Sequence, residues 1–135
     1  MAIKNEMVTT ILRVFLGATF LIHGVAKFQG GIENTAGFFE SLGLPGFSAY
    51  VVALIELIGG IAVILGIGTR VISILFAIVL AVAIVKVKIA VGFLGNGQMA
   101  GYELDLALMA ISIYLAAANK SVLALDNVLF RSEKA

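Results

Sequence analysis

The sequence contains no cysteine, and its only histidine is His23. Without cysteine the chain cannot form disulfides, hold a metal or iron–sulfur cluster through thiolates, or run a dithiol relay. One histidine cannot ligate a haem on both sides or build a histidine-rich metal cage. No metal, haem or flavin site is therefore evident, so any redox chemistry depends on a bound molecule such as a quinone or on a partner protein.

Charged residues are also scarce: they make up 13% of the 135 residues, whereas 61% are hydrophobic and the mean hydropathy is +1.14. An ordinary soluble domain carries about 25% charged residues. Nine Lys and Arg against eight Asp and Glu give a net charge of +1, which excludes a nucleic-acid binder that relies on bulk positive charge. The composition instead predicts a single domain, residues 1–135, with the lipid bilayer as its solvent.

Four apolar segments are candidates for membrane-spanning helices, at about residues 7–27, 47–68, 70–94 and 102–119. Twenty helical residues rise about 30 Å, which is enough to cross the hydrocarbon core. The first segment is interpreted as a retained helix rather than a signal peptide, because no A-x-A-like cleavage site follows it. We therefore predict an all-α fold, an integral membrane four-helix bundle.

The connections add a short helix and an orientation. Between the first two segments, Asn34 or Thr35 could cap a helix that carries Phe38, Phe39 and Leu42 and lies along the interface or over the mouth of the bundle. Basic residues lie six on one side of the membrane (Lys4, Arg13, Arg70, Lys120, Arg131, Lys134) and three on the other (Lys27, Lys86, Lys88). This distribution predicts a multi-pass protein of the cell membrane with both termini in the cytoplasm.

Glu56 is the only charged residue of the second segment and lies near its middle. A charge in the bilayer costs several kcal/mol, which makes such a residue a functional candidate. A buried carboxyl can give or take protons at neutral pH. The alternative is a structural hydrogen bond or ion pair with Arg13, His23 or a lysine.

The first segment carries Arg13 and Lys27 fourteen residues apart, and hence on one helical face with Phe20 between them. His23 lies one turn before Lys27 on the same side. Arg13 and Lys27 could also simply extend to the two interfaces, and a lone histidine is often a hydrogen-bonded core residue.

A group of polar residues is expected at one mouth of the bundle: His23, Lys27, Lys86, Lys88, Tyr102, Glu103 and Asp105. Lys86 and Lys88 are two apart, so we expect at most one of them to face the bundle. The group predicts a polar pocket above Glu56, or else paired helix ends with lysines that reach the interface. Gly59 and Gly60, one turn from Glu56, either allow close helix packing or leave room for a flat ligand.

Several short motifs follow one another in a defined order. They are Arg13, Gly17 and Phe20, then His23-Gly24-Val25-Ala26-Lys27-Phe28, Glu56-Leu57-Ile58-Gly59-Gly60, Leu65-Gly66, Thr69-Arg70 and Gly101-Tyr102-Glu103. In order and spacing they resemble the DoxX family of small four-helix membrane proteins, from Arg13 to Asp126. Within that family the chain is most similar to the CatD-type oxidoreductases.

The resemblance implies a membrane subunit linked to quinone or quinol redox chemistry and to resistance against oxidative or electrophile stress, including that from catechols and quinones. It also implies important polar positions at Arg13, His23, Lys27, Glu56, Arg70 and Glu103.

Three functional hypotheses follow. The first is an oxidoreductase component that binds a quinone-like ring between the first, second and fourth segments. Glu56, His23 and Lys27 would be its catalytic residues, and the substrate-binding residues would be Arg13, Phe20, Arg70, Tyr102 and Glu103. The second is a non-catalytic membrane anchor for a soluble redox partner protein. The third is a small transporter of protons or a small solute, which could act as a homo-oligomer.

Overall fold

The computed structural model describes residues 2–118 and 124–126. In this part of the chain every long element is a helix: α1 (Ala2–Gln29), α2 (Ile32–Ser41), α3 (Phe47–Leu65), α4 (Thr69–Ala83), the π-helical segment η1 (Ile84–Lys88) and α5 (Glu103–Ala117). The predicted all-α fold class is confirmed.

Three of these helices are long and apolar enough to cross a membrane: Lys4–Gln29, Phe47–Leu65 and Thr69–Lys88. Their outer faces carry large apolar side chains that are mostly exposed, such as Ile22 at 67% and Phe47 at 69%. Water would not tolerate so large an apolar surface, whereas lipid does. The chain is an integral membrane protein, as its composition predicts.

The observed helix boundaries differ from the predicted ones in the second half of the chain. The third segment ends as a helix at Lys88 rather than near residue 94, because a π turn and then Gly92, at a φ of +101°, end the regular repeat. The last helix, α5, spans 15 residues, and the predicted end at residue 119 lies outside the described residues. A fourth membrane crossing stays a prediction.

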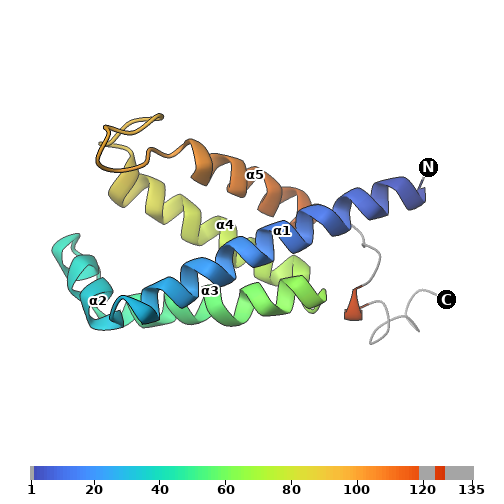
Figure 1. Ribbon diagram of the computed structural model, residues 1–135, viewed down its shortest axis with the longest axis horizontal. Coiled ribbons are helices and arrows are strands. Elements are labelled where there is room, and N and C mark those ends of the chain that lie inside the picture. Colours follow the sequence, from blue (N-terminus) through green and yellow to red (C-terminus); the bar gives the residue numbers. More distant parts are fainter. Residues whose placement is uncertain (1, 119–123, 127–135) are drawn as a thin grey trace.

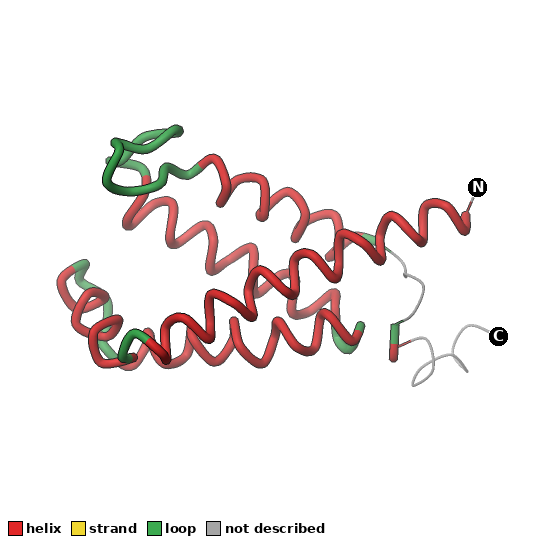
Figure 2. The backbone as a smooth tube through the Cα atoms, viewed as in Figure 1, coloured by secondary structure: helices red, strands yellow, loops and turns green. Residues whose placement is uncertain are grey.

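The helices form two pairs, α1 with α3 and α4 with α5 (Figure 1). The pairs separate toward the end that carries α2 and the loop of residues 89–102, seen on the left in Figures 1 and 2 and called the α2 end below. The opposite end carries the N-terminus and the α3–α4 turn. The apolar core joins the pairs, and in it the Phe20 and Phe76 rings stack with centroids 3.8 Å apart.

Glycines allow α1 and α3 to pack backbone against backbone. A Cβ added at Gly17 would lie 2.7 Å from the carbonyl oxygen of Gly60, and one added at Gly24 would lie 2.7 Å from the nitrogen of Leu57. Small residues at a helix crossing permit this close approach. The contact of Gly24 with Leu57 also sets the register that brings the next turn of α1 beside Glu56.

The short helix predicted in the first connection is present as α2, but it begins at Ile32, before the predicted cap positions Asn34 and Thr35. Gly31, with a φ of +94°, precedes the helix, whereas the predicted cap Asn34 donates from its side-chain amide to the carbonyl oxygen of Gly30 at 2.9 Å. Glycine takes this role because it adopts a positive φ without steric cost. The helix buries no residue fully. It packs against α3 and α1 at the α2 end of the bundle (Figure 1).

Candidate functional site

An ion pair joins α1 to α3 at the α2 end. The Lys27 ammonium lies 2.7 Å from Glu56 Oε1, with side-chain exposures of 23% and 7%. Lys27 is in the last turn of α1, and Glu56 is in the middle of α3. Of the partners considered from the sequence, the structure selects a lysine and not Arg13 or His23.

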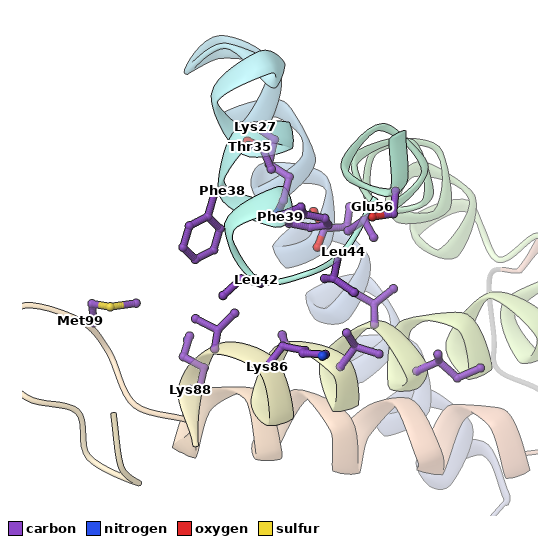
Figure 3. A pocket seen from close by; sticks show the side chains of 17 residues that line it. Lys27, Thr35, Phe38, Phe39, Leu42, Leu44, Glu56, Lys86, Lys88 and Met99 are labelled. Carbon is purple, nitrogen blue, oxygen red and sulfur yellow. The ribbon is translucent and has the colours of Figure 1, made fainter. Parts of the chain in front are cut away.

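The ion pair borders a cavity of about 530 Å³. Its lining comes from α1, α2, α3, α4, η1 and the two loops that follow α2 and η1 (Figure 3): Lys27, Thr35, Phe38, Phe39, Leu42, Leu44, Ser48, Val52, Glu56, Ile78, Val79, Val82, Ala83, Lys86, Val87, Lys88 and Met99. Apolar side chains dominate, with a few polar groups among them. A largely apolar cavity with convergent polar groups is the usual form of a small-molecule site.

Two further lysines line the same cavity, although at most one was expected to face the bundle. Lys88 Nζ lies 3.3 Å from Asp105 Oδ2 and donates to the carbonyl oxygen of Gly101 at 3.4 Å. Lys86 has no hydrogen-bond or ion-pair partner among the residues that the structure describes. Both lysines reach the cavity although they are two residues apart, Lys86 as an exposed side chain and Lys88 through its pair with Asp105.

Several predicted site residues lie away from the cavity. His23 is exposed on α1, and Glu103 is exposed in the first turn of α5. Tyr102 packs edge-on against Phe93, with ring centroids 5.5 Å apart. Phe20 belongs to the core. None of these four lines the cavity.

Arg13 lies at the opposite end and is 2% exposed. Its Nη2 donates to the carbonyl oxygen of Ile64 at 3.2 Å, and the carboxylate of Asp126 attracts it electrostatically. Asp126 in turn accepts a hydrogen bond from the Gly68 N–H at 2.8 Å. Asp126, whose backbone N–H also donates to the carbonyl oxygen of Gly66 at 3.0 Å, therefore ties the α3–α4 turn to residues 124–126.

Arg70 is exposed and donates to the carbonyl oxygen of Ala118 at 3.3 Å. Like Arg13, it is far from the cavity, because α4 begins at the end of the bundle opposite α2. The structure thus brings together Lys27, Glu56 and the η1 lysines, and it separates them from both arginines.

The sequence reasoning missed the apolar walls of the cavity. Ile78, Val82 and Lys86 follow one another at spacings of four residues, so they share one face of the α4–η1 helix, and Met99 comes from the following loop. The helical spacing was readable, but the sequence does not indicate that this face borders a cavity instead of another helix. Phe38 and Phe39 were recognised as part of a helix and not as a wall.

This arrangement can hydrogen-bond and charge-stabilise a ring oxygen, and it can exchange a proton through Glu56 or Lys27. No group of three His, Cys, Asp or Glu side chains within the described residues could hold a metal ion. The cavity offers polar contacts for an organic ligand at one edge and apolar contacts for its body elsewhere.

Comparisons with known proteins place the chain in a family. Residues 8–89 match the DoxX family model. The chain is 46% identical over 129 residues to "Putative oxidoreductase CatD" of Bacillus subtilis (strain 168), covering 96% of this chain and 92% of that protein. It is 32% identical over 114 residues to an uncharacterized membrane protein of Mycobacterium tuberculosis, covering 77% and 70%.

An uncharacterized protein of Haemophilus influenzae is 29% identical over 125 residues, covering 89% of both chains. No solved structure matches. The family match covers more than half of the chain and includes Lys27, Glu56 and both η1 lysines. The chain belongs to the DoxX family.

Proposed function

We propose that this chain is the membrane component of a quinone- or quinol-linked oxidoreductase system. The observation that carries the proposal is the Lys27–Glu56 ion pair at the edge of an apolar cavity of about 530 Å³. A ring of one or two fused six-membered cycles fits a space of this size. The similarity to a relative whose name describes an oxidoreductase supports the redox class.

In this proposal the ring lies among the apolar walls, and Lys27 donates a hydrogen bond to one ring oxygen. Glu56 exchanges the proton that accompanies electron transfer. Reduction of a quinone to a quinol takes up two electrons and two protons, and the side chains of this sequence supply only protons. The electrons come from a soluble redox partner protein or from a second quinol.

We further propose that the reaction removes reactive quinones and so contributes to resistance against oxidative or electrophile stress. With both termini in the cytoplasm, as the basic residues predict, the cavity opens toward the outer leaflet. Electrophilic catechol and quinone compounds that partition into the membrane would then reach it from the lipid.

A membrane anchor for soluble redox enzymes is the second candidate, because the chain lacks cysteine and has a single histidine. Transport is less well supported. Leu16, Phe20 and Phe76 form a buried apolar layer between Glu56 and Arg13. A proton or ion path through the described residues would have to cross that layer.

The test is a titration of the purified protein in mild detergent with a short-chain quinone and its quinol, followed by thermal unfolding. A ligand that binds the native form raises its stability by mass action. We expect a saturable increase that Glu56→Gln abolishes.

The matched controls are Glu103→Gln and His23→Ala, which change exposed residues outside the cavity and should preserve the increase. If the native protein shows no stabilisation at millimolar quinone, the chain by itself has no quinone site. That result would favour the function as a membrane anchor.

A further inference from the structure

The charges around the cavity do not balance. Lys27, Lys86 and Lys88 all line it. Lys27 pairs with Glu56 and Lys88 pairs with Asp105, at 2.7 Å and 3.3 Å. Lys86 has no such partner among the described residues. Within the part of the chain that the structure describes, one positive charge of the cavity wall therefore has no counter-charge.

The position of Lys86 makes this charge available to a ligand. It lies in η1, where the Ile89 N–H donates to the carbonyl oxygen of Ile84 at 2.8 Å across a π turn. Ile78 and Val82 continue the same face of the helix, and Phe38 and Leu42 of the α2 region lie across the cavity (Figure 3). The Lys86 side chain is exposed and borders a space that is otherwise mostly apolar, so its ammonium group is accessible to a ligand in the cavity.

We propose that the cavity selects a ring ligand that carries one negative charge, namely an ionised hydroxyquinone-type ring whose oxyanion contacts Lys86. This inference rests on the proposed function and narrows its substrate class. The ring body would lie against the apolar walls, and a neutral carbonyl oxygen would face Lys27.

Charge complementarity argues for a single negative charge. A neutral ring offers the exposed Lys86 ammonium group no opposite charge, whereas an oxyanion forms a charge-assisted hydrogen bond with it. A second negative charge on the ring would approach Glu56, whose carboxylate already neutralises Lys27. One oxyanion satisfies Lys86 and disturbs neither existing ion pair.

The experiment compares two ligands of nearly equal shape, the hydroxynaphthoquinone lawsone, which is ionised at neutral pH, and its uncharged methyl ether. Binding is measured by calorimetry on the full chain in a non-ionic detergent. Because a hydrogen bond to a charged group is worth more than a neutral one, we expect lawsone to bind about tenfold more tightly.

Lys86→Gln should remove this preference while the affinity for the methyl ether changes by less than about twofold, since only the charge contact is lost. Retained binding of the ether shows that the variant is folded. Lys86→Arg should keep the preference. Lys4→Gln, a change of an exposed lysine at the other end of α1, is the matched control and should keep it as well.

The inference would be overturned if the native protein bound the two ligands equally, or if the preference for lawsone survived in Lys86→Gln. Neither result would contradict the proposed quinone site. Failure of both ligands to bind would overturn the proposed function with it.

A fatty acid from the lipid carries the same kind of negative charge, so decanoate is tested as a competitor. Lys86-dependent displacement of lawsone by equimolar decanoate would assign the cavity to acyl chains and contradict the inference, whereas lack of displacement supports it.

Discussion

Helix α1 contacts α3 through two cationic side chains, Arg13 near the C-terminus of α3 and Lys27 in the last turn of α1, and their surroundings differ. Arg13 is 2% exposed and reaches a backbone carbonyl of α3, with Asp126 nearby. Lys27 pairs with Glu56 but keeps 23% of its side chain exposed, beside a cavity. The first site is enclosed by protein and the second is open. An enclosed charge destabilises the fold when its partner is removed, whereas an open pair can also meet a ligand.

The two sites are separated by the tightest part of the bundle. There Gly17 and Gly60 bring the backbones of α1 and α3 together, and the stacked rings of Phe20 and Phe76 fill the core. Among the described residues, the hydrogen bonds and ion pairs of the two sites do not connect through this layer. The two sites should therefore respond independently to mutation, and the following changes test that separation, from the largest expected effect to the smallest.

Replacing Arg13 by Met should cost the most stability. The substitution removes the donor to the Ile64 carbonyl and the charge that attracts Asp126, and loss of a charged hydrogen-bond partner from a buried site costs about 3 kcal/mol. Thermal or denaturant unfolding in detergent measures the loss, and Arg70→Met, at an exposed position, is the control. Equal stability of the two variants would show that Arg13 is not a structural anchor. Any folded Arg13→Met protein should still bind quinone.

Substituting Gly60 by Ala should disturb both sites. The added methyl would meet the Gly17 carbonyl oxygen at 2.7 Å, and overpacking of this kind costs about 1–3 kcal/mol. The displaced α1 should also weaken the contact of Lys27 with Glu56 and reduce quinone binding. Gly37→Ala is the control, because a Cβ at that helical position meets nothing within 4 Å. The control should raise stability by about 0.4–1 kcal/mol; a similar gain for Gly60→Ala would refute the close packing.

A double-mutant cycle on Lys27→Met and Glu56→Gln measures what the open pair contributes. We expect a coupling of about 1–2 kcal/mol, within the range for groups in direct contact. The double variant should regain most of the stability lost in Lys27→Met, because no unpaired carboxylate remains. Quinone-induced stabilisation should stay absent in it. Recovery of ligand binding in the double variant would mean that the pair is purely structural.

The smallest effect is expected from Asp126→Ala. Its carboxylate accepts the N–H of Gly68, the residue before α4, and loss of one such hydrogen bond costs about 1 kcal/mol while Arg13 keeps its bond to Ile64. Unfolding measurements alone and combined with Arg13→Met test the link, since residues that interact should give non-additive losses. Strict additivity would show that Arg13 and Asp126 act separately.

Much of the fold was predictable because the bilayer constrains it. Long apolar stretches, scarce charge and glycine-bounded turns determine a helical membrane protein, since backbone polar groups in lipid must bond within a helix. A short helix capped by Asn34 or Thr35 was predicted in the first connection, and the structure has a helix there that begins earlier, at Ile32. The end of the third segment was not predicted, because a π turn has no clear signature in composition or period.

The sequence predicted that ionisable residues form a site in the membrane, but not which of them lie together. Glu56 stood out because a charge within an apolar segment is costly, and Lys27 stood out as a cation on the same helix as Arg13. Their pairing depends on the rotation and register of α1 against α3, which the glycine contacts set. His23 shares a helical side with Lys27 by spacing, yet the structure leaves it exposed and outside the cavity lining.

The sequence by itself determined that this chain is a helical membrane protein with a few ionisable groups in its apolar segments. Hydrophobicity and residue type suffice to predict this fold class. The free-energy cost of exposing backbone polar groups to lipid is the same however the helices later pack. The tertiary structure alone decided which charges meet, where the cavity opens and that Lys86 borders it with no counter-charge among the described residues. These depend on helix rotation and on the divergence of two helix pairs, which side-chain packing sets and hydrophobicity does not.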